Sequence, residues 1–227
     1  MKKIIIPFIC LAIFSAPVSA QTSKTATVEK NQKSLTAKQV LDRYFEALGG
    51  KQNLENVKSV IIEGTTSVQG TQISTITKKM GNKFRSENNS DGRKMLQVFD
   101  GQGGYVKQLD KEANLTAEQI KEFKKGNTVD ALALDKVENM KFLNTEKIDG
   151  ISYNVLTSDK SKFYFDANTG LLYKTVVNGA EVIIKDYITQ NGIKFPGTTE
   201  IKAQGQQIIT KNNKITLNSG VTEADFK

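Results

Sequence analysis

Short runs of alternating apolar and polar residues, each ended by a glycine, asparagine or aspartate, fill most of this chain of 227 residues. In the stretch 58–69, Val60, Ile62 and Val68 stand at alternate positions, as in a β-strand with one buried face. The turn residues Gly70 and Gly81-Asn82 then follow at the spacing of β-hairpins. Because parallel strands need long crossover connections, this spacing predicts an antiparallel meander rather than a parallel sheet.

The predicted strands form two groups, five before a break and seven after it. They lie at 58–69, 71–79, 83–87, 94–100, 105–109, 141–148, 152–157, 162–166, 171–178, 180–189, 192–205 and 206–217. The break has helical spacing: Thr116 and Gln119 fit a capping box, and Gly126 ends the turn. The stretch 129–137 predicts one further short helix.

An amphipathic helix is predicted ahead of the first strand. Thr36 and Gln39 again fit a capping box, and the pair Gly49-Gly50 ends the helix. The apolar residues between them recur at helical spacing and lie on one face: Val40, Leu41, Tyr44, Phe45 and Leu48. Such a stripe must pack on an apolar surface.

The first twenty residues have the pattern of a secretory signal peptide. Lys2 and Lys3 precede an apolar run at 4–14, and the small residues Val-Ser-Ala follow at 18–20. The run is shorter than the roughly 20 residues that span a bilayer. We therefore expect a signal peptide at 1–20, a flexible polar leader at 21–34, one domain at 35–227 and a periplasmic or secreted location.

The single cysteine, Cys10, lies inside the apolar run and ahead of the predicted cleavage site. A lipid anchor at Cys10 would leave that cleavage site without a purpose. The expected mature chain is therefore unanchored and free of cysteine, and its stability must come from a packed core rather than from disulfides.

The chain contains no histidine, which excludes His-based triads, imidazole bases and His-ligated zinc. Without cysteine in the mature chain, thiolate chemistry is excluded as well. We therefore expect a binding protein that is not an enzyme and needs no cofactor or metal.

The charge pattern excludes some partners and allows others. The chain has 32 basic and 24 acidic residues, a net charge of +8, which becomes +6 once Lys2 and Lys3 leave with the signal. The basic residues are scattered among acids, and secretion argues against a nucleic-acid partner. Transient contact with anionic membrane surfaces fits the positive charge.

Two motifs suggest ligand sites but are better explained as turns. The glycine-rich stretch 101–104 lies between two predicted strands, with no helix N-terminus to bind a phosphate. The stretch 166–170 resembles the start of a calcium loop, but Val177 stands where a bidentate Glu is needed.

A carboxylate-dependent hydrolase would need two converging acids, for which the candidates are Glu63, Glu87, Asp100 and Asp110.

A helix on the concave side of a curved sheet can either fill that side as a core or leave a cavity, and the sequence allows both. An apolar cavity could hold an acyl chain without any catalytic group, since each buried methylene contributes roughly 0.8 kcal/mol. The candidate ligand-binding residues are Ile62, Val68, Phe84, Met95, Phe99, Tyr105, Phe123 and Leu132; Val60, Tyr153, Phe163 and Phe165 are further candidates for the same side.

Several short motifs keep a common order and spacing over about residues 35–227. They lie at 40–50, 82–85, 97–101, 163–172 and 192–196, with Asp149-Gly150, Asp186-Tyr187 and Phe226 between or after them. In this order they resemble the outer-membrane lipoprotein carrier superfamily, the LolA/LolB-like or outer membrane lipoprotein-sorting proteins. The motifs consist mainly of turn and core residues, so they specify fold better than ligand.

The resemblance implies a mainly β (α+β) fold, an antiparallel half-open β-barrel with an N-terminal helix and an inserted helical lid at 116–137. It implies an apolar cavity for the acyl chains of lipoproteins or lipids, and an outer-membrane acceptor protein as a partner. The carriers close their cavity with a basic residue on an early strand, for which Lys78, Lys79 and Arg85 are the candidates.

From these expectations we predict a periplasmic binding protein that holds a lipid or the acyl chains of a lipoprotein for transfer to the outer membrane. The alternative is a non-catalytic accessory or structural envelope module that binds another protein and has a filled core. Related domains accompany insulinase-type zinc peptidases, whose His-containing metal motif this chain lacks.

Overall fold

The computed structural model describes residues 35–159 and 161–227; the predicted signal peptide, with Cys10, and the predicted leader lie outside them. In chain order the elements are α1 (Ala37–Ala47), α2 (Lys51–Glu55), β1 (Val60–Val68), β2 (Thr71–Met80), β3 (Lys83–Ser90), β4 (Arg93–Phe99), β5 (Gly104–Gln108), β6 (Lys111–Asn114), α3 (Ala117–Phe123), the 3-10 helix η1 (Asp130–Lys136), β7 (Lys141–Ile148), β8 (Ile151–Thr157), β9 (Ser161–Asp166), β10 (Leu172–Val177), β11 (Ala180–Ile184), β12 (Tyr187–Gln190), β13 (Ile193–Pro196), β14 (Thr198–Ala203), β15 (Gln206–Leu217) and the 3-10 helix η2 (Glu223–Phe226). The meander interrupted by helices is confirmed.

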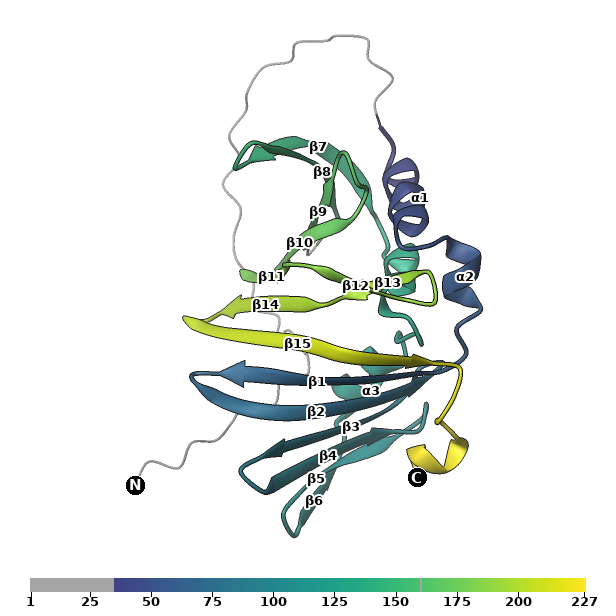
Figure 1. The fold of residues 1–227 in the computed structure, drawn as a ribbon, viewed down its shortest axis with the longest axis vertical. Coiled ribbons are helices and arrows are strands. Elements are labelled where there is room, and N and C mark those ends of the chain that lie inside the picture. Colours follow the sequence, from purple (N-terminus) through teal and green to yellow (C-terminus); the bar gives the residue numbers. More distant parts are fainter. Residues whose placement is uncertain (1–34, 160) are drawn as a thin grey trace.

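Thirteen strands form one antiparallel sheet in the order β6-β5-β4-β3-β2-β1-β15-β14-β11-β10-β9-β8-β7. The long strands β1 and β15 pair in its middle, with Val60 opposite Leu217, so the two ends of the domain meet there. The sheet is not closed, because β6 and β7 stay as separate edges, and it curls strongly at β7–β10 (Figure 1). This arrangement confirms the predicted half-open barrel.

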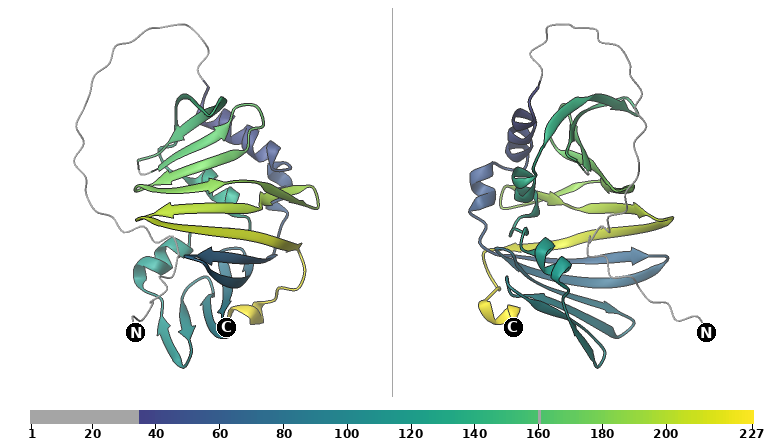
Figure 2. Two further views of the ribbon diagram at one scale, coloured as in Figure 1. Left: turned by 60° about the vertical axis from the view of Figure 1, so that its left-hand side comes forward. Right: turned by 180° about the vertical axis from the view of Figure 1, so that it is seen from behind.

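The helices α1, α3 and η1 lie on one face of the sheet, which we call the inner face. Seen from behind, α3 and η1 lie in front of the strands (Figure 2). The main core joins buried residues of α1 to the inner faces of β8 and β9 through Leu156, Phe163 and Phe165. The ring of Tyr44 meets that of Phe165 edge-on, with the centroids 5.2 Å apart.

The first helix forms as its sequence predicts. The hydroxyl of Thr36 accepts a hydrogen bond from the backbone N–H of Gln39, whose side chain accepts from the backbone N–H of Thr36. Its whole predicted apolar stripe is buried. The helix ends before Gly49, which has a φ of +117°, and a Cβ there would lie 2.3 Å from the carbonyl oxygen of Gly192. The second capping box, at Thr116 and Gln119, is confirmed in the same way.

Two predicted strands are wrong as continuous elements, because 180–189 divides into β11 and β12, and 192–205 into β13 and β14. The backbone N–H of Gly197 donates to the carbonyl oxygen of Asp186 (2.9 Å), and the N–H of Thr198 donates to its Oδ1 (2.8 Å). A Cβ at Gly197 would lie 2.0 Å from that Oδ1, so only glycine permits this contact. As a result β12 and β13 leave the main sheet as a separate hairpin.

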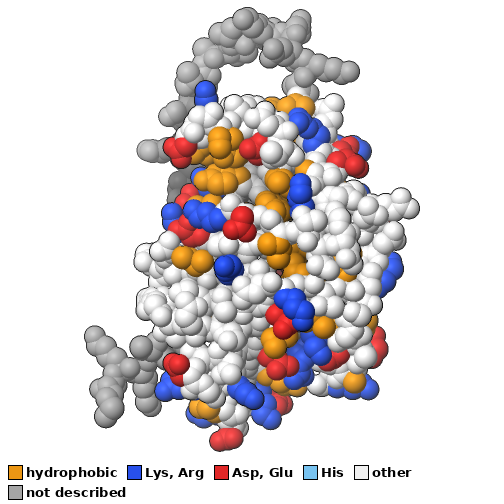
Figure 3. All heavy atoms as spheres, viewed as in Figure 1, with side chains coloured by type: hydrophobic (Ala, Val, Ile, Leu, Met, Phe, Trp, Pro, Cys, Tyr) orange, Lys and Arg blue, Asp and Glu red, His pale blue; other side chains and the backbone are white. Residues whose placement is uncertain are grey.

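The opposite, outer face of the sheet has its own packing. Tyr153, Val155 and Tyr164 form a second buried cluster there, so the expectation that Tyr153 lies on the concave side is wrong. Figure 3 shows this face, with hydrophobic side chains gathered over β8–β10. Near the C-terminal end of the chain, η2 is tied to the outer face by the ion pairs Lys78–Asp225 (2.5 Å) and Lys83–Glu223 (2.6 Å).

Candidate functional site

Strand register decides which side chains share the inner face, because residues opposite each other in paired strands point the same way. Three rows of inner-face residues cross β1, β2, β3 and β4 in turn. They are Val60-Lys79-Phe84-Phe99, Ile62-Thr77-Ser86-Gln97 and Gly64-Thr75-Asn88-Met95. The sheet therefore presents a mixed polar and apolar floor to the helices above it.

A pocket of about 540 Å³ lies on this floor, beneath α3 and beside η1. Its volume is within the range of roughly 300–1,000 Å³ that small-molecule sites span. We call it the larger pocket. Its lining residues are Ile62, Thr66, Val68, Ile73, Thr75, Thr77, Lys79, Asn82, Phe84, Ser86, Asn88, Met95, Gln97, Glu122, Phe123, Gly126, Asp130, Ile201, Ile208, Thr210 and Asn212.

A second pocket of about 360 Å³, the smaller pocket, adjoins the first between α1, η1 and the strands β13–β15. The two share Ile62, Asp130 and Asn212 as lining residues. Tyr44 of α1, Leu48 directly after that helix and Phe195 of β13 contribute to its apolar walls. The two pockets form adjacent compartments of one inner face.

Lys79 and Asp130 form an ion pair at the border between the compartments. Lys79 comes from β2 and its side chain is only 13% exposed, whereas Asp130 begins η1 and its side chain is 78% exposed. Because a mostly buried ammonium group needs a partner, this contact holds the start of η1 on the sheet.

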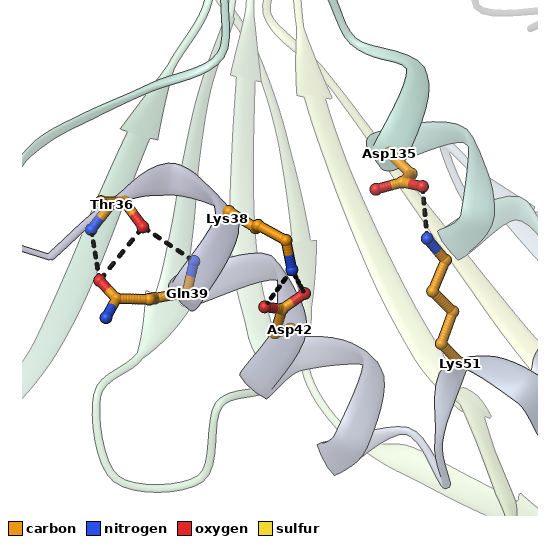
Figure 4. A network of polar contacts seen from close by, with 6 residues as sticks. All are labelled: Thr36, Lys38, Gln39, Asp42, Lys51 and Asp135. Atoms are coloured by element: carbon orange, nitrogen blue, oxygen red, sulfur yellow. Dashed lines mark hydrogen bonds and ion pairs between the residues drawn. The ribbon is translucent and has the colours of Figure 1, made fainter.

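Two further contacts tether the segment that contains η1. The backbone N–H of Gly81 donates to the hydroxyl of Thr128 at 2.8 Å, just before the helix. At its other end, Lys51 of α2 makes an ion pair with Asp135 at 2.5 Å (Figure 4). Polar contacts therefore fix the segment at both ends, in addition to the apolar packing of Val129, Leu132 and Leu134 on the main core.

Five of the predicted ligand-binding residues lie together in the lining of the larger pocket: Ile62, Val68, Phe84, Met95 and Phe123. Phe99 is fully buried behind them, with its ring 5.6 Å from that of Phe123. Leu132 of η1 packs against the main core. These two support the pocket wall without lining either pocket.

Tyr105 and two of the three basic candidates lie on the outer face. Tyr105 stands opposite Val98, which stands opposite Arg85, and Arg85 stands opposite Lys78. The two basic residues on the outer face form ion pairs there: Lys78 with Asp225, and Arg85 with Glu87 at 2.7 Å. Of the three basic candidates, the register brings Lys79 to the pockets.

Apart from Lys79, the polar lining of the larger pocket was not among the sequence candidates, and of the residues that line the smaller pocket only Ile62 was. Thr75, Thr77 and Ser86 were not predicted, because an acyl chain calls for apolar wall residues and small hydroxyl side chains are common on any strand. Their alternation with outer-face residues was visible in the sequence, as was the two-residue turn that pairs Lys79 with Phe84. The smaller pocket depends on how α1 and η1 sit on the sheet, for which the sequence holds no local signal.

Tyr44, which is buried, and Tyr187, which is partly buried, form a hydrogen-bonded pair beside the smaller pocket. Burial raises the pKa of Tyr44 and of Tyr187 well above its ordinary value, and their hydroxyls bond to each other. Tyr187 also donates to the carbonyl oxygen of Leu172 at 2.7 Å. Both phenols therefore stay neutral, and this wall offers hydroxyl groups rather than charge.

The described residues contain no group of three or more His, Cys, Asp or Glu side chains placed to hold a metal ion. The four acids named as catalytic candidates do not line either pocket. Glu63 is paired with Lys214 at 2.8 Å, and Asp100 accepts two backbone hydrogen bonds in its turn. Within the described part of the chain, no helix is both long and apolar enough to cross a membrane.

No protein-family model and no curated protein matches the sequence. Among solved structures, one named as an outer membrane lipoprotein-sorting protein domain from Vibrio parahaemolyticus matches with a TM-score of 0.57 and 14% identity, over 84% of this chain and 97% of that one. A DUF1329 family protein from Desulfovibrio piger matches with a TM-score of 0.55 and 12% identity, over the same shares of the two chains. At these identities the likeness is one of fold: the chain has the half-open barrel fold of these two proteins.

Proposed function

We propose that the protein holds the acyl chains of a lipid or a lipoprotein on the inner face of its half-open barrel. The observation that carries this proposal is the pair of adjoining pockets, of about 540 and 360 Å³, left open under the helices. A module with a filled core would have no such space there.

The energetics of burial favour this use of the pockets. About twelve buried methylenes would contribute roughly 10 kcal/mol, since each contributes about 0.8 kcal/mol. Association costs on the order of 4–15 kcal/mol for lost freedom of motion. At the lower end of that cost several kcal/mol remain, a moderate affinity that suits a carrier that must release what it binds.

The ion pair Lys79–Asp130 acts in this proposal as the latch of a lid formed by α3 and η1. Opening the latch would join the two compartments, because Asp130 lines both of them. Asp130, the lid's side of the pair, is mostly exposed and therefore screened by salt, so higher salt should ease the opening of the lid.

The protein acts, in this proposal, as a non-enzymatic carrier of the cell envelope that transfers its ligand to an outer-membrane acceptor. Its predicted signal peptide and its fold, shared with a domain named for lipoprotein sorting, support this role. The absence of histidine from the sequence supports binding without catalysis.

A bulky substitution inside the larger pocket tests the proposal. Ile73 lines the pocket from β2, and the neighbouring Gln72 is exposed on the other face of the same strand. We expect Ile73→Trp to weaken binding of a pyrene-labelled dodecanoyl methyl ester at least about 10-fold, because the indole fills space that the chain needs. The matched control Gln72→Trp should bind like the wild type.

Delipidated protein that binds no acyl probe, or equal binding by both variants, would contradict the proposal. Co-purification of a protein in place of lipid would then favour the accessory module. Fluorescence titration measures the affinity of the wild type, Ile73→Trp and Gln72→Trp for the pyrene-labelled ester.

A further inference from the structure

The middle of the larger pocket is lined by uncharged hydrogen-bonding groups. Thr75 and Asn88 lie side by side in one row of the floor, and Thr77 and Ser86 in the next. The hydroxyls of Thr75 and Thr77 make no hydrogen bond within the described part of the chain. A purely hydrocarbon ligand would strip water from these groups and offer them nothing in return.

The two ends of the same pocket differ: one is apolar, and the other combines two aromatic rings with the Lys79–Asp130 ion pair. Val68, Ile73, Ile201 and Ile208 lie at the end towards the β1–β2 turn, while Phe84 and Phe123 lie at the other. An occupant that fits this lining has a polar group in its middle and apolar parts on either side, or one apolar chain ending at the polar band.

Charge further restricts what that polar group can be. The charged residues of the described lining are Lys79, Glu122 and Asp130, and each is in an ion pair, Glu122 with Lys125 at 2.8 Å. The three sum to a net charge of −1 although the whole chain is basic. A carboxylate or phosphate inside this pocket would meet no available cation and would be repelled.

We propose that the larger pocket selects acyl lipids whose head group is uncharged and offers several hydrogen-bonding atoms, such as a glyceryl ester, over fatty acids, phospholipids and simple alkyl esters. The inference rests on the proposed function and narrows its ligand class. The same chemistry occurs in a free monoacylglycerol and in the diacylglyceryl group of a lipidated peptide.

Three ligands with the same twelve-carbon acyl chain test the selection: monolauroylglycerol, methyl laurate and laurate. We expect monolauroylglycerol to bind about 10-fold more tightly than either of the others at pH 7.5, since two hydrogen bonds of ordinary strength correspond to that ratio. Isothermal titration calorimetry measures each affinity. A dilauroylglyceryl-cysteine peptide and dilauroylglycerol, which carry the same two chains, form a further pair, and tighter binding of the peptide identifies a lipidated protein as the source.

The variant Thr75→Val/Thr77→Val removes two hydroxyls and keeps the shape and strand propensity of both side chains. We expect it to lower the preference for monolauroylglycerol over methyl laurate to about 2-fold. The control Thr65→Val/Thr216→Val makes the same change on the outer faces of β1 and β15 and should keep the preference.

Equal affinity for all three ligands overturns the inference. So does a preference for monolauroylglycerol that persists in Thr75→Val/Thr77→Val. Either result leaves the proposal of acyl binding intact. Tightest binding of laurate overturns the inference as well. If no ligand binds, the proposed function itself is contradicted, and the selection with it.

Discussion

At a few positions only one kind of residue fits the backbone, and these positions fix how neighbouring elements meet. The glycine at position 49 ends α1 against the backbone of Gly192, and the glycine at position 197 admits the carboxylate of Asp186. Lys79 points inward and Lys78 outward only because a two-residue turn at Gly81-Asn82 sets the register of β2 against β3. Local geometry of this kind decides which charges reach the pockets.

We predict that Gly49→Ala lowers the free energy of unfolding by at least about 2 kcal/mol. An alanine there would need a φ near +117° and would place its Cβ 2.3 Å from the oxygen of Gly192. Gly103→Ala is the control, because no positive φ and no atom within 4 Å constrain that position. Urea unfolding followed by circular dichroism measures both, and an equal loss in the two variants would refute the steric reason.

A second prediction at this scale concerns acid stability. Lys185, at 2.6 Å, and Gln207 hold the pKa of the Glu200 carboxyl at about 2 in the folded chain, below its ordinary 4.5. Because the folded-state pKa is lowered, the stabilisation is present above pH 4.5 and is lost as the pH falls towards 2.

Urea unfolding between pH 7 and pH 3 should therefore show a shallower loss of stability for Glu200→Gln than for the wild type. The exposed acid Glu118 lies on α3, and Glu118→Gln serves as the control with a wild-type pH dependence. Parallel pH profiles of Glu200→Gln and the wild type would contradict this role.

At the scale of elements, the sequence predicts those that depend on local patterns. Both capping boxes, the α1 stripe and nearly all strands follow from spacing and turn residues. The short helix α2 and the fully exposed strand β6 were not predicted, because neither has an apolar periodicity. The pockets could not be predicted, since they depend on where α1, α3 and η1 rest on the sheet.

In the proposed function η1 must move to let the ligand in. We therefore predict that Asp130→Asn speeds ligand entry several-fold. The change breaks the ion pair with Lys79, so the lid opens more often, and stability falls by about 1 kcal/mol. Stopped-flow mixing with the pyrene-labelled dodecanoyl ester measures the entry rate. Glu118→Gln, on the neighbouring α3, should leave that rate unchanged; an unchanged rate in Asp130→Asn would refute the latch.

For the whole molecule, the open sheet is the feature that joins fold to function. Two strands far apart in the sequence, β1 and β15, pair at its centre, and the edges β6 and β7 stay apart. A closed barrel of small size would fill its interior with side chains. This half-open sheet keeps two compartments under its helices instead.

The central claim is that those compartments hold lipid, and native mass spectrometry of the protein purified from the cells that make it tests this claim most directly. The account predicts a bound species of lipid mass, near one per chain, that solvent extraction removes and that acyl ligand restores. A chain that carries no lipid when purified, and takes up none when acyl ligand is added, would contradict the account.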